Sequence, residues 1–331
     1  MAALRKFIEK VNDKGKYSPI VRYDEPMYRH TTFKVGGRAD VWIRPAKDIF
    51  PDYASRLLKA AREEGIPVFV LGAGANIVVS DRGIRGIVLD TGAFRGIGKR
   101  EDRQGPSGED FQEKKIQREK AFFSVAVLSG TSVDGLTSRL AERGLSGLEF
   151  LAGMPGSAGG AVYMNARCYE KSVSDVLLET EILDENFERR VIPFRAEDFS
   201  YKKSPFQGRR VLILQARFAV QFGESVDIYK EIINYRQDRT VKGHYRNPSA
   251  GSAFKNSRDN NDPTGRIIDQ LGFRGLSIGG AQVAPWHGNM IINTGNALAS
   301  DIKNLMDEIA RRVKEERGIE LESEILFVGE W

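Results

Sequence analysis

The chain has 331 residues, of which 41% are apolar and 29% are charged. This composition is typical of a soluble globular protein with room for two or three domains, and it excludes a disordered chain or a membrane protein. The net charge of +5 suits an anionic, phosphorylated substrate, although an ordinary basic surface explains it equally well.

The few cysteines and histidines limit the chemistry and the location of the protein. Cys168 is the only cysteine, so no internal disulfide can form, as expected in a reducing cytoplasm. Three histidines beside one cysteine offer no zinc-type cluster, and we expect no metal site. No stretch approaches the roughly 20 apolar residues that span a bilayer, and the first residues lack the apolar core of a signal peptide. We therefore expect a cytoplasmic protein.

The first ninety residues predict a small α+β subdomain. The spacing of apolar residues indicates a helical N-terminal segment, a helix that ends at Gly65, and several strands. These elements are expected at 1–25 (helical), 31–44 (strand around a turn at Gly36 and Gly37), 48–64 (helix), and 68–71, 77–80 and 87–89 (strands).

Residues 99–120 interrupt this pattern, because nearly all of them are charged or turn-forming. Acidic and basic residues nearly balance and aromatic residues are sparse, so a solvated loop is favoured over a nucleic-acid-binding patch. A second subdomain follows, and we place a domain boundary at 221–223, where the strand pattern stops. The elements around it are expected at 121–128, 176–183 and 211–218 (strands) and at 132–143 and 227–239 (helices).

The last hundred residues predict a third region of helices and strands. Its longest helix has apolar residues on one face and ends at Gly318. Helices are expected at 264–271 and 300–317, with strands near 278, at 290–293 and at 321–329. The predicted domains are an N-terminal helical segment (1–25), two subdomains (26–92 and 93–222) and a C-terminal domain (223–331).

Two glycine-rich stretches, LGAGAN at 71–76 and GMPGSAGGAVYMNA at 153–166, are the most informative motifs. Glycine lets the backbone approach a ligand closely, and successive amides can form a nest for phosphate oxygens. Together they predict a long diphosphate cofactor held between two loops, although tight turn packing would explain either loop alone. The first stretch lacks the third glycine of the nicotinamide fingerprint and continues as a strand, so an ordinary Rossmann site is not expected.

A third stretch, TTFKVGGRAD at 31–40, precedes these two. All three resemble, in order and separation, the FAD-binding half of the UDP-N-acetylenolpyruvoylglucosamine reductases, also called UDP-N-acetylmuramate dehydrogenases. The resemblance implies an α+β chain, with a two-subdomain FAD-binding fold of the vanillyl-alcohol-oxidase/PCMH type over 26–222 and a C-terminal α+β substrate-binding domain. It implies non-covalent FAD held by Gly72, Ala73, Gly74, Ala75, Asn76 and Ser80 of the first loop and by Gly153, Pro155, Gly156, Ser157, Gly159 and Gly160 of the second.

The stretch GSAFKN at 251–256 contains the first catalytic candidate, Ser252. It lacks the Gly-x-Ser-x-Gly elbow of a hydrolase nucleophile. From the spacing alone, a turn serine bonded to its own backbone is the favoured interpretation. The stretch resembles the catalytic-serine motif of the family, which implies that Ser252 donates a proton and that Asn256 contacts the nucleotide-sugar.

Glu324, in the stretch LESEILFVG at 321–329, is the second catalytic candidate. Without the resemblance it would be a solvent-facing carboxylate of a strand. In the family, a glutamate ahead of a branched aliphatic residue works beside the serine, which implies Glu324 rather than Glu322. Relatives carry arginine two residues later, where this chain has Leu326, so one flavin or substrate contact is expected to differ.

Lys202 takes the place of an arginine in the family's Tyr-Arg-x-Ser segment, and Tyr201 before it is an implied substrate contact. Lysine keeps the positive charge but loses the planar fork, so we expect activity with a weaker hold on the substrate carboxylate. A surface lysine is the alternative. The separation of Lys202 and Ser252 along the chain suits the shorter form of the family, which lacks an extra substrate-clamping loop. Arg239 and Lys242 resemble an Arg-x-x-Lys that contacts flavin and diphosphate, although cations at a helix C-terminus are favoured anyway.

The implied enzyme is an oxidoreductase acting on a CH–CH bond with NADP⁺ as acceptor. It reduces UDP-N-acetylglucosamine enolpyruvate to UDP-N-acetylmuramate for peptidoglycan synthesis, with FAD reduced by NADPH as the hydride donor. Lys202 and Glu324 would stabilise an enolate-like intermediate, and Ser252 would act as general acid. The expected partners are this substrate and NADPH, with no nucleic acid, no membrane and a monomeric protein.

Two alternatives remain open. Another FAD-dependent oxidase or dehydrogenase of the same fold would need neither the GSAFKN stretch nor Glu324, and it often carries covalent flavin, for which no well-placed residue is present. A non-catalytic flavin- or nucleotide-sugar-binding relative would have lost its chemistry with the arginine. The presence of both Ser252 and Glu324 argues against it.

Overall fold

The computed structural model describes residues 1–102, 123–256 and 262–331, which form two compact units. Unit 1 contains Met1–Val21, Ile43–Ala73 and Val88–Gln237, whereas unit 2 contains Arg22–Trp42, Gly74–Ile87 and Asp238–Trp331. Two N-terminal segments are therefore grouped with the C-terminal part of the chain. The domain limits given above stay a prediction.

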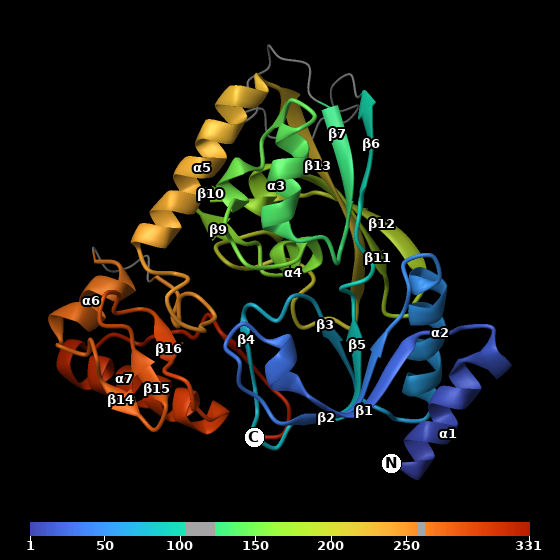
Figure 1. The fold of residues 1–331 in the computed structure, drawn as a ribbon, viewed down its shortest axis with the longest axis horizontal. Helices are drawn as coiled ribbons and strands as arrows, with labels where there is room; N and C mark the ends of the chain where they lie inside the picture. The colour runs from blue at the N-terminus through green and yellow to red at the C-terminus, as the bar shows by residue number, and fades with distance from the viewer. Residues whose placement is uncertain (103–122, 257–261) are drawn as a thin grey trace. The chain divides into compact units, whose positions relative to one another are not determined.

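An antiparallel sheet forms the centre of unit 1 (Figure 1). Helices α3 (Val133–Ala141) and α4 (Ala158–Tyr163) pack on it and share its core, in which Leu136, Val162 and Phe218 are buried. The strand order is β12 (Arg189–Pro193), β11 (Leu177–Leu183), β13 (Leu212–Phe222), β7 (Phe123–Leu128) and β6 (Ile97–Asp102), with β8 (Leu145–Ser146) paired to the end of β13.

A second sheet has the order β1 (Ile20–Pro26), β2 (Arg38–Arg44), β5 (Ile84–Asp90) and β3 (Val68–Leu71).

Helices α1 (Ala2–Val11) and α2 (Phe50–Glu63) confirm two helices expected from apolar spacing. Helix α2 buries Tyr53, Leu57 and Ala61, and Gly65 follows it with a φ of +66°. In the same unit the Tyr53 hydroxyl donates to Asn12 Oδ1 (2.9 Å), directly after α1. The two helices are thus joined by a polar contact as well as by apolar packing.

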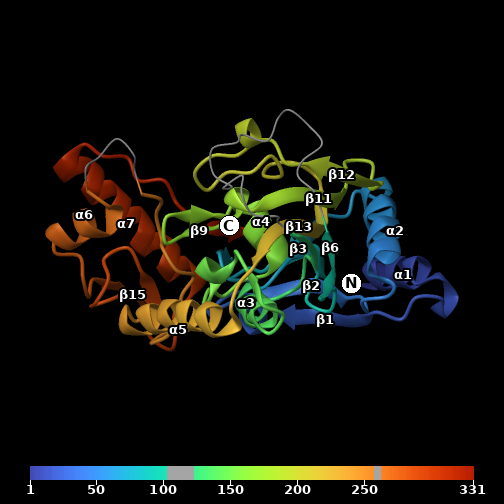
Figure 2. The same cartoon turned by 90° about the horizontal axis from the view of Figure 1, so that it is seen from above.

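Unit 2 is built around helix α7 (Ala299–Arg317). The helix buries the predicted apolar face and ends at Gly318, whose φ is +68°. It packs on α6 (Thr264–Gln270) and on an antiparallel sheet of β14 (Ser277–Ile278), β15 (Ala281–Val283) and β16 (Ile291–Asn293), which are labelled in Figure 1. Helices α6 and α7 and strand β15 are seen from another side in Figure 2. The buried residues of α7 are Ile302, Leu305, Met306, Ile309 and Val313.

A parallel strand pair joins two distant stretches of the sequence within unit 2. Strand β4 (Ile77–Val79) follows the first glycine stretch and pairs with β17 (Leu326–Val328) near the end of the chain. The other elements are α5 (Ser225–Val241), β9 (Arg167–Cys168), β10 (Lys171–Ser172) and 3₁₀ helices at Asp13–Gly15, Met27–His30, Glu149–Leu151, Val173–Asp175 and Ala196–Asp198. None of the described helices is both long enough and apolar enough to cross a membrane.

Several predicted boundaries were wrong. Strand β1 occupies the end of the segment predicted as helical, and β15 was missed. The strand expected over 31–44 begins only at Arg38, because Lys34 and Gly36 have positive φ angles that interrupt an extended chain. The final strand contains only 326–328 of the nine residues expected. The first residues of the charged loop expected at 99–120 belong to β6, and those from 103 on lie outside the described residues.

Candidate active site

The second glycine stretch forms the turn before helix α4 in unit 1. The Ser157 hydroxyl caps this helix by accepting the Gly160 amide (3.3 Å), and the Val133 N–H donates to Gly156 O (3.1 Å). Within the described parts of the chain, the amides of Gly156 and Ser157 have no hydrogen-bond acceptor. Two adjacent donors are thus available to a ligand, as a phosphate nest requires.

Close packing requires glycine at two of the predicted positions. A Cβ atom at Gly72 would lie 2.5 Å from Ser157 Oγ, and one at Gly159 would lie 2.7 Å from Ser129 Cβ. The two glycine stretches therefore touch within unit 1. The Ser129 hydroxyl beside Gly159 is buried and has no hydrogen-bond partner among the described residues.

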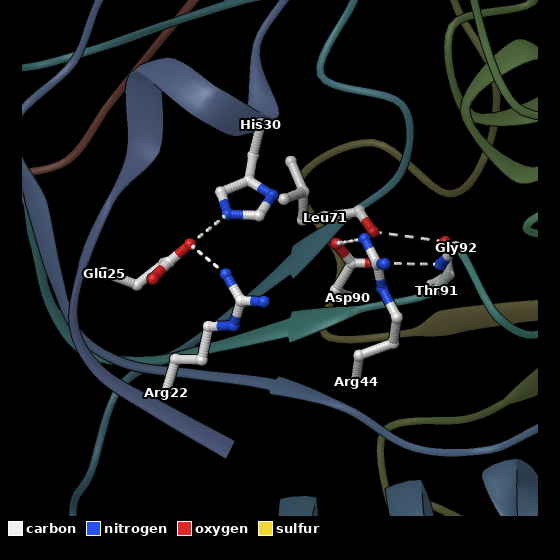
Figure 3. A network of polar contacts seen from close by, with 8 residues as sticks. All are labelled: Arg22, Glu25, His30, Arg44, Leu71, Asp90, Thr91 and Gly92. Carbon is white, nitrogen blue, oxygen red and sulfur yellow. Dashed lines mark hydrogen bonds and ion pairs between the residues drawn. The ribbon is translucent and has the colours of Figure 1, made fainter. Parts of the chain in front are cut away.

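A partly buried ion pair supports the strand that leads into Gly72. Arg44 donates from Nε and Nη2 to the two carboxylate oxygens of Asp90 (3.1 and 3.0 Å), and Asp90 is only 2% exposed. The Thr91 hydroxyl donates to Leu71 O (3.1 Å), the last residue of β3 (Figure 3). The position of Gly72 is thus fixed through its neighbour in the chain.

Lys202 lies in a tight turn of unit 1 and has a left-handed backbone. Ser200 and Lys203 exchange two backbone hydrogen bonds (3.2 and 3.1 Å), and Lys202 between them has a φ of +58°. Non-glycine residues rarely adopt this conformation, which costs about 1–3 kcal/mol and occurs preferentially at functional sites. The strain favours the functional interpretation of Lys202 over that of an ordinary surface lysine.

Two side-chain amides hold this turn to the end of helix α4. Gln207 Nε2 donates to the carbonyl oxygens of Lys202 (3.1 Å) and Tyr163 (2.9 Å). Asn165, which is buried, donates from Nδ2 to Ser200 O (2.8 Å). Helix α4 begins at the glycine turn, and the bonds of Gln207 and Asn165 join the Lys202 turn to the residues at its other end. The helix thus connects the second glycine stretch with the Lys202 turn.

Ser252 lies in unit 2 on a segment that Asn289 braces. Ser252 forms an isolated β-bridge with Met290, and the Ala253 N–H donates to Asn289 O (2.9 Å). The Asn289 side chain accepts the Phe254 N–H (2.9 Å) and donates to Phe254 O (2.7 Å). In the described chain, the partly exposed Ser252 hydroxyl has no hydrogen-bond partner, unlike a turn serine bonded to its own backbone.

Glu324 lies on a segment paired with that of Ser252. Its N–H donates to Ala253 O (2.9 Å), and the neighbouring residues Phe254 and Ser323 form a β-bridge. Unit 2 therefore brings together the serine and the glutamate that the family resemblance implied, from segments about seventy residues apart.

The contacts of Glu322 support the choice of Glu324 as the candidate. Glu322 Oε1 lies 2.5 Å from Lys255 Nζ, and Glu322 O accepts the Lys255 N–H (2.9 Å). Glu322 thus completes the pairing of the two segments through an ion pair. Leu326, where the family resemblance implied an arginine, is 39% exposed and begins β17.

The end of the first glycine stretch belongs to unit 2. Gly74 has a φ of +64°, and a Cβ atom there would collide with the carbonyl oxygen of His30. His30 is itself fixed, because its Nε2 lies 2.9 Å from Glu25 Oε1 (Figure 3). Its ring also stacks on Trp42. Ser80, another predicted cofactor residue, is buried and donates its hydroxyl to Glu330 O, so its side chain supports the C-terminal strand.

Three further predicted site residues, Arg239, Lys242 and Asn256, lie in unit 2 at or beside the ends of helices. Arg239, in the last turn of α5, is buried, and Lys242 Nζ pairs with Asp238 Oδ2 (2.8 Å). Asn256 Oδ1 accepts the Thr264 N–H (3.1 Å) at the start of α6. The binding roles of these residues stay predictions.

The residues that brace the candidate site were missed from the sequence. Asn165, Gln207 and Asn289 act through bonds to backbone groups 35, 5 and 35 positions away. They lie in irregular segments, where no hydrophobic period marks them, and an amide side chain alone does not predict a clamp.

His244 is expected to make stability depend on pH. Burial, then Arg239, His287 and Lys242, lower the pKa of His244 from its ordinary 6.5 to about 4. Because the unfolded chain gains this proton at a higher pH than the folded protein, we expect the free energy of unfolding to fall between about pH 6.5 and pH 4. Urea unfolding at several pH values should show a shallower fall for His244→Asn. An identical fall in both proteins would contradict the assignment.

Asp81 is expected to stabilise helix α7. Its carboxylate accepts the amides of Ala299 (2.8 Å) and Ser300 (2.9 Å) in the first turn of α7. Asp81→Ala removes this cap and a favourable charge at the helix N-terminus, so the free energy of unfolding should fall by about 1 kcal/mol. Urea unfolding measures the loss, and Asp81→Asn, which keeps one acceptor, should lose less. A loss equal to that of Asp81→Asn would show that the acceptor kept by asparagine contributes nothing, and that the charge and the second bond account for the whole effect.

The described residues of unit 1 fit a diphosphate cofactor. Among the described residues, the amides of Gly156 and Ser157 have no acceptor and the Ser129 hydroxyl has no partner. Gly72 packs against the Ser157 side chain, and Ser129 lies against Gly159. Cys168, which a covalent flavin could use, donates its thiol to Phe150 O (2.7 Å). The described residues contain no cluster of three or more His, Cys, Asp or Glu able to hold a metal ion.

The fold and this site define an α+β flavoprotein of the oxidoreductase class. Residues 51–188 match the FAD binding domain, and residues 243–328 match the C-terminal domain of UDP-N-acetylenolpyruvoylglucosamine reductase. The reductase of that name from Treponema denticola is 37% identical over 94% of both chains, and that from Bacillus subtilis is 33% identical over 97% of this chain and 99% of its own. The chain belongs to the UDP-N-acetylenolpyruvoylglucosamine reductase family.

A solved structure supports the same conclusion. The crystal structure of UDP-N-acetylenolpyruvylglucosamine reductase from Thermus caldophilus has a TM-score of 0.67 and 29% identity, covering 94% of this chain and 99% of that one. The predicted fold class, an FAD-binding domain followed by the family's own C-terminal domain, is therefore confirmed.

Proposed function

We propose that this protein reduces UDP-N-acetylglucosamine enolpyruvate to UDP-N-acetylmuramate, with FAD as cofactor and NADPH as reductant, in peptidoglycan synthesis. The observation that supports the proposal is the backbone pairing of the segment that carries Ser252 with the segment that carries Glu324. The family relatives bear the name of this reductase.

The glycine stretches would hold the flavin. The amides of Gly156 and Ser157 would bind its diphosphate, and Gly72 would leave room for the close approach of the two loops. When bound and reduced by NADPH, FAD supplies the hydride that adds to the alkene.

Residues of this chain would stabilise the negative charge that develops on the substrate and would supply the proton. Negative charge develops on the carboxylate-bearing carbon after the first addition, and the ammonium group of Lys202 would stabilise it. Ser252 Oγ–H would then transfer its proton to that carbon, and Glu324 would assist as the acidic partner. The product gains one hydride and one proton, which saturates the former double bond.

The remaining expectations follow from this reaction. Arg239 would contact the flavin, and Tyr201, Lys242 and Asn256 would contact the substrate. We propose that the enzyme works in the cytoplasm as a monomer and needs neither nucleic acid nor a membrane. The competing function is that of a different FAD-dependent oxidase of the same fold. Such an oxidase would need neither Ser252 nor Glu324, so it would not explain why their segments are paired.

An anaerobic visible spectrum tests the proposal. NADPH should bleach the flavin band of the full-length protein, and the enolpyruvyl nucleotide-sugar should restore it. A flavin that stays bleached after the substrate is added would favour the oxidase. A protein that binds no flavin after incubation with FAD would refute the proposal altogether.

A further inference from the structure

Asn76 is bonded to the candidate catalytic segment through both its side chain and its backbone. Its Nδ2 donates to Glu324 O (2.9 Å), and its own carbonyl oxygen accepts the Leu326 N–H (3.0 Å). The residue between these two partners, Ile325, is 2% exposed and packs in the core of unit 2. One residue of the first glycine stretch thus holds the chain on both sides of Ile325.

The opposite side of Glu324 is bonded to the serine segment. The Glu324 N–H donates to Ala253 O (2.9 Å), next to Ser252. Both peptide groups of Glu324 are therefore fixed, one by the serine segment and one by Asn76. Glu324 lies before β17, outside the pairing of β17 with β4, and the Asn76 amide donates to its backbone carbonyl there.

We infer that Asn76 is a positioning residue for Glu324, which its side-chain amide orients relative to Ser252. The inference rests on the proposed function, because it assumes that Glu324 takes part in the reduction of the substrate. It gives the Asn76 side chain a role different from the cofactor contact that the family resemblance implied. Asn76 is the one residue of the stretch LGAGAN whose side chain carries a hydrogen-bond donor, so the bond to Glu324 O depends on its amide.

This role predicts that the two halves of the reaction respond differently to a change at Asn76. Reduction of the flavin by NADPH does not use Glu324, whereas reoxidation by the enolpyruvyl substrate does. A displacement of a catalytic group by about 1 Å can cost about 10²-fold in rate. Loss of the Asn76 bond should therefore slow only the second half-reaction.

The test uses full-length Asn76→Ala protein and anaerobic stopped-flow spectroscopy. We expect FAD content and the rate of flavin reduction by NADPH to stay within about twofold of wild type, and reoxidation by substrate to slow by about 10- to 100-fold. In a Glu324→Gln background, Asn76→Ala should add less than about twofold, because coupled residues are not additive. Asn76→Asp, which keeps the volume and the backbone bond to Leu326 but lacks the donor, serves if the alanine variant unfolds.

Ser323→Ala is the matched control. It removes another side-chain bond to a backbone carbonyl of the same segment, from Ser323 Oγ to Ile325 O (2.8 Å). This variant should be reoxidised at the wild-type rate. Equal slowing in Ser323→Ala would overturn the inference in favour of general loosening. Weaker FAD binding or slower reduction by NADPH in Asn76→Ala would overturn it in favour of a flavin contact. A wild-type protein that the substrate fails to reoxidise would overturn the proposed function and this inference together.

Discussion

Ser252→Ala is expected to slow reoxidation of the reduced flavin by the enolpyruvyl substrate by about 10²- to 10⁴-fold, the usual contribution of a positioned general acid. Alanine fits the segment, because the bonds of Asn289 hold the backbone of Ala253 and Phe254 and not the Ser252 side chain. FAD binding and flavin reduction by NADPH should not change, since no proton from Ser252 is needed there. Anaerobic stopped-flow spectroscopy separates the two rates.

Two further variants make this result specific. Ser277→Ala removes an exposed hydroxyl in the same unit, bonded to Gly275 O (3.2 Å), and should leave both rates unchanged. Ser252→Cys keeps a weak donor and should fall between wild type and alanine. Reoxidation of Ser252→Ala within about threefold of wild type would show that another group supplies the proton.

Local features of the structure could be predicted from the sequence. Helix α7 follows from five apolar residues at helical spacing and a glycine at its end, because these determine which face is buried and where the helix stops. The two glycine stretches could also be recognised, because glycine occurs where close packing excludes a larger side chain. Gly72 and Gly74 meet a neighbouring side chain and a backbone carbonyl that leave no room for a Cβ atom.

Features that depend on distant partners could not be predicted. The stretch 321–329 alternates like a strand, yet only Leu326–Val328 forms one, because the preceding residues pair instead with 253–255. The periodicity records which residues are apolar but not which segment lies beside them. The pairing of β4 with β17, and with it the bond from Asn76 to Glu324, joins residues about 250 positions apart.

The turn at Lys202 has one feature that the sequence predicted and one that depends on contacts made in the fold. The sequence showed a cation in place of the family arginine. The positive φ of Lys202, however, is held by two backbone bonds between Ser200 and Lys203 and by the bond from Gln207 Nε2 to Lys202 O. A lysine in this conformation is unfavourable locally, so the surrounding contacts must hold it there. Such strain points to a role that a glycine, the easier residue for this turn, could not perform.

Lys202→Gly is therefore expected to separate activity from stability. Loss of the ammonium group should lower kcat by about 10²-fold, since it removes stabilisation of developing negative charge. The free energy of unfolding should stay the same or rise by up to about 1 kcal/mol, because relief of the left-handed strain is partly offset by the greater freedom of glycine in the unfolded chain. Steady-state kinetics and urea unfolding of the same preparation measure the two effects.

Lys202→Ala and Lys202→Arg decide whether charge or backbone is responsible. Alanine loses the charge but keeps the positive φ, so it should lose as much activity as glycine without gaining stability. Arginine keeps the charge and adds a planar fork, so it should lower KM for the enolpyruvyl substrate with little change in stability. If Lys202→Gly were as active as wild type, the cation would have no part in the reaction, and the strain at this turn would serve packing alone.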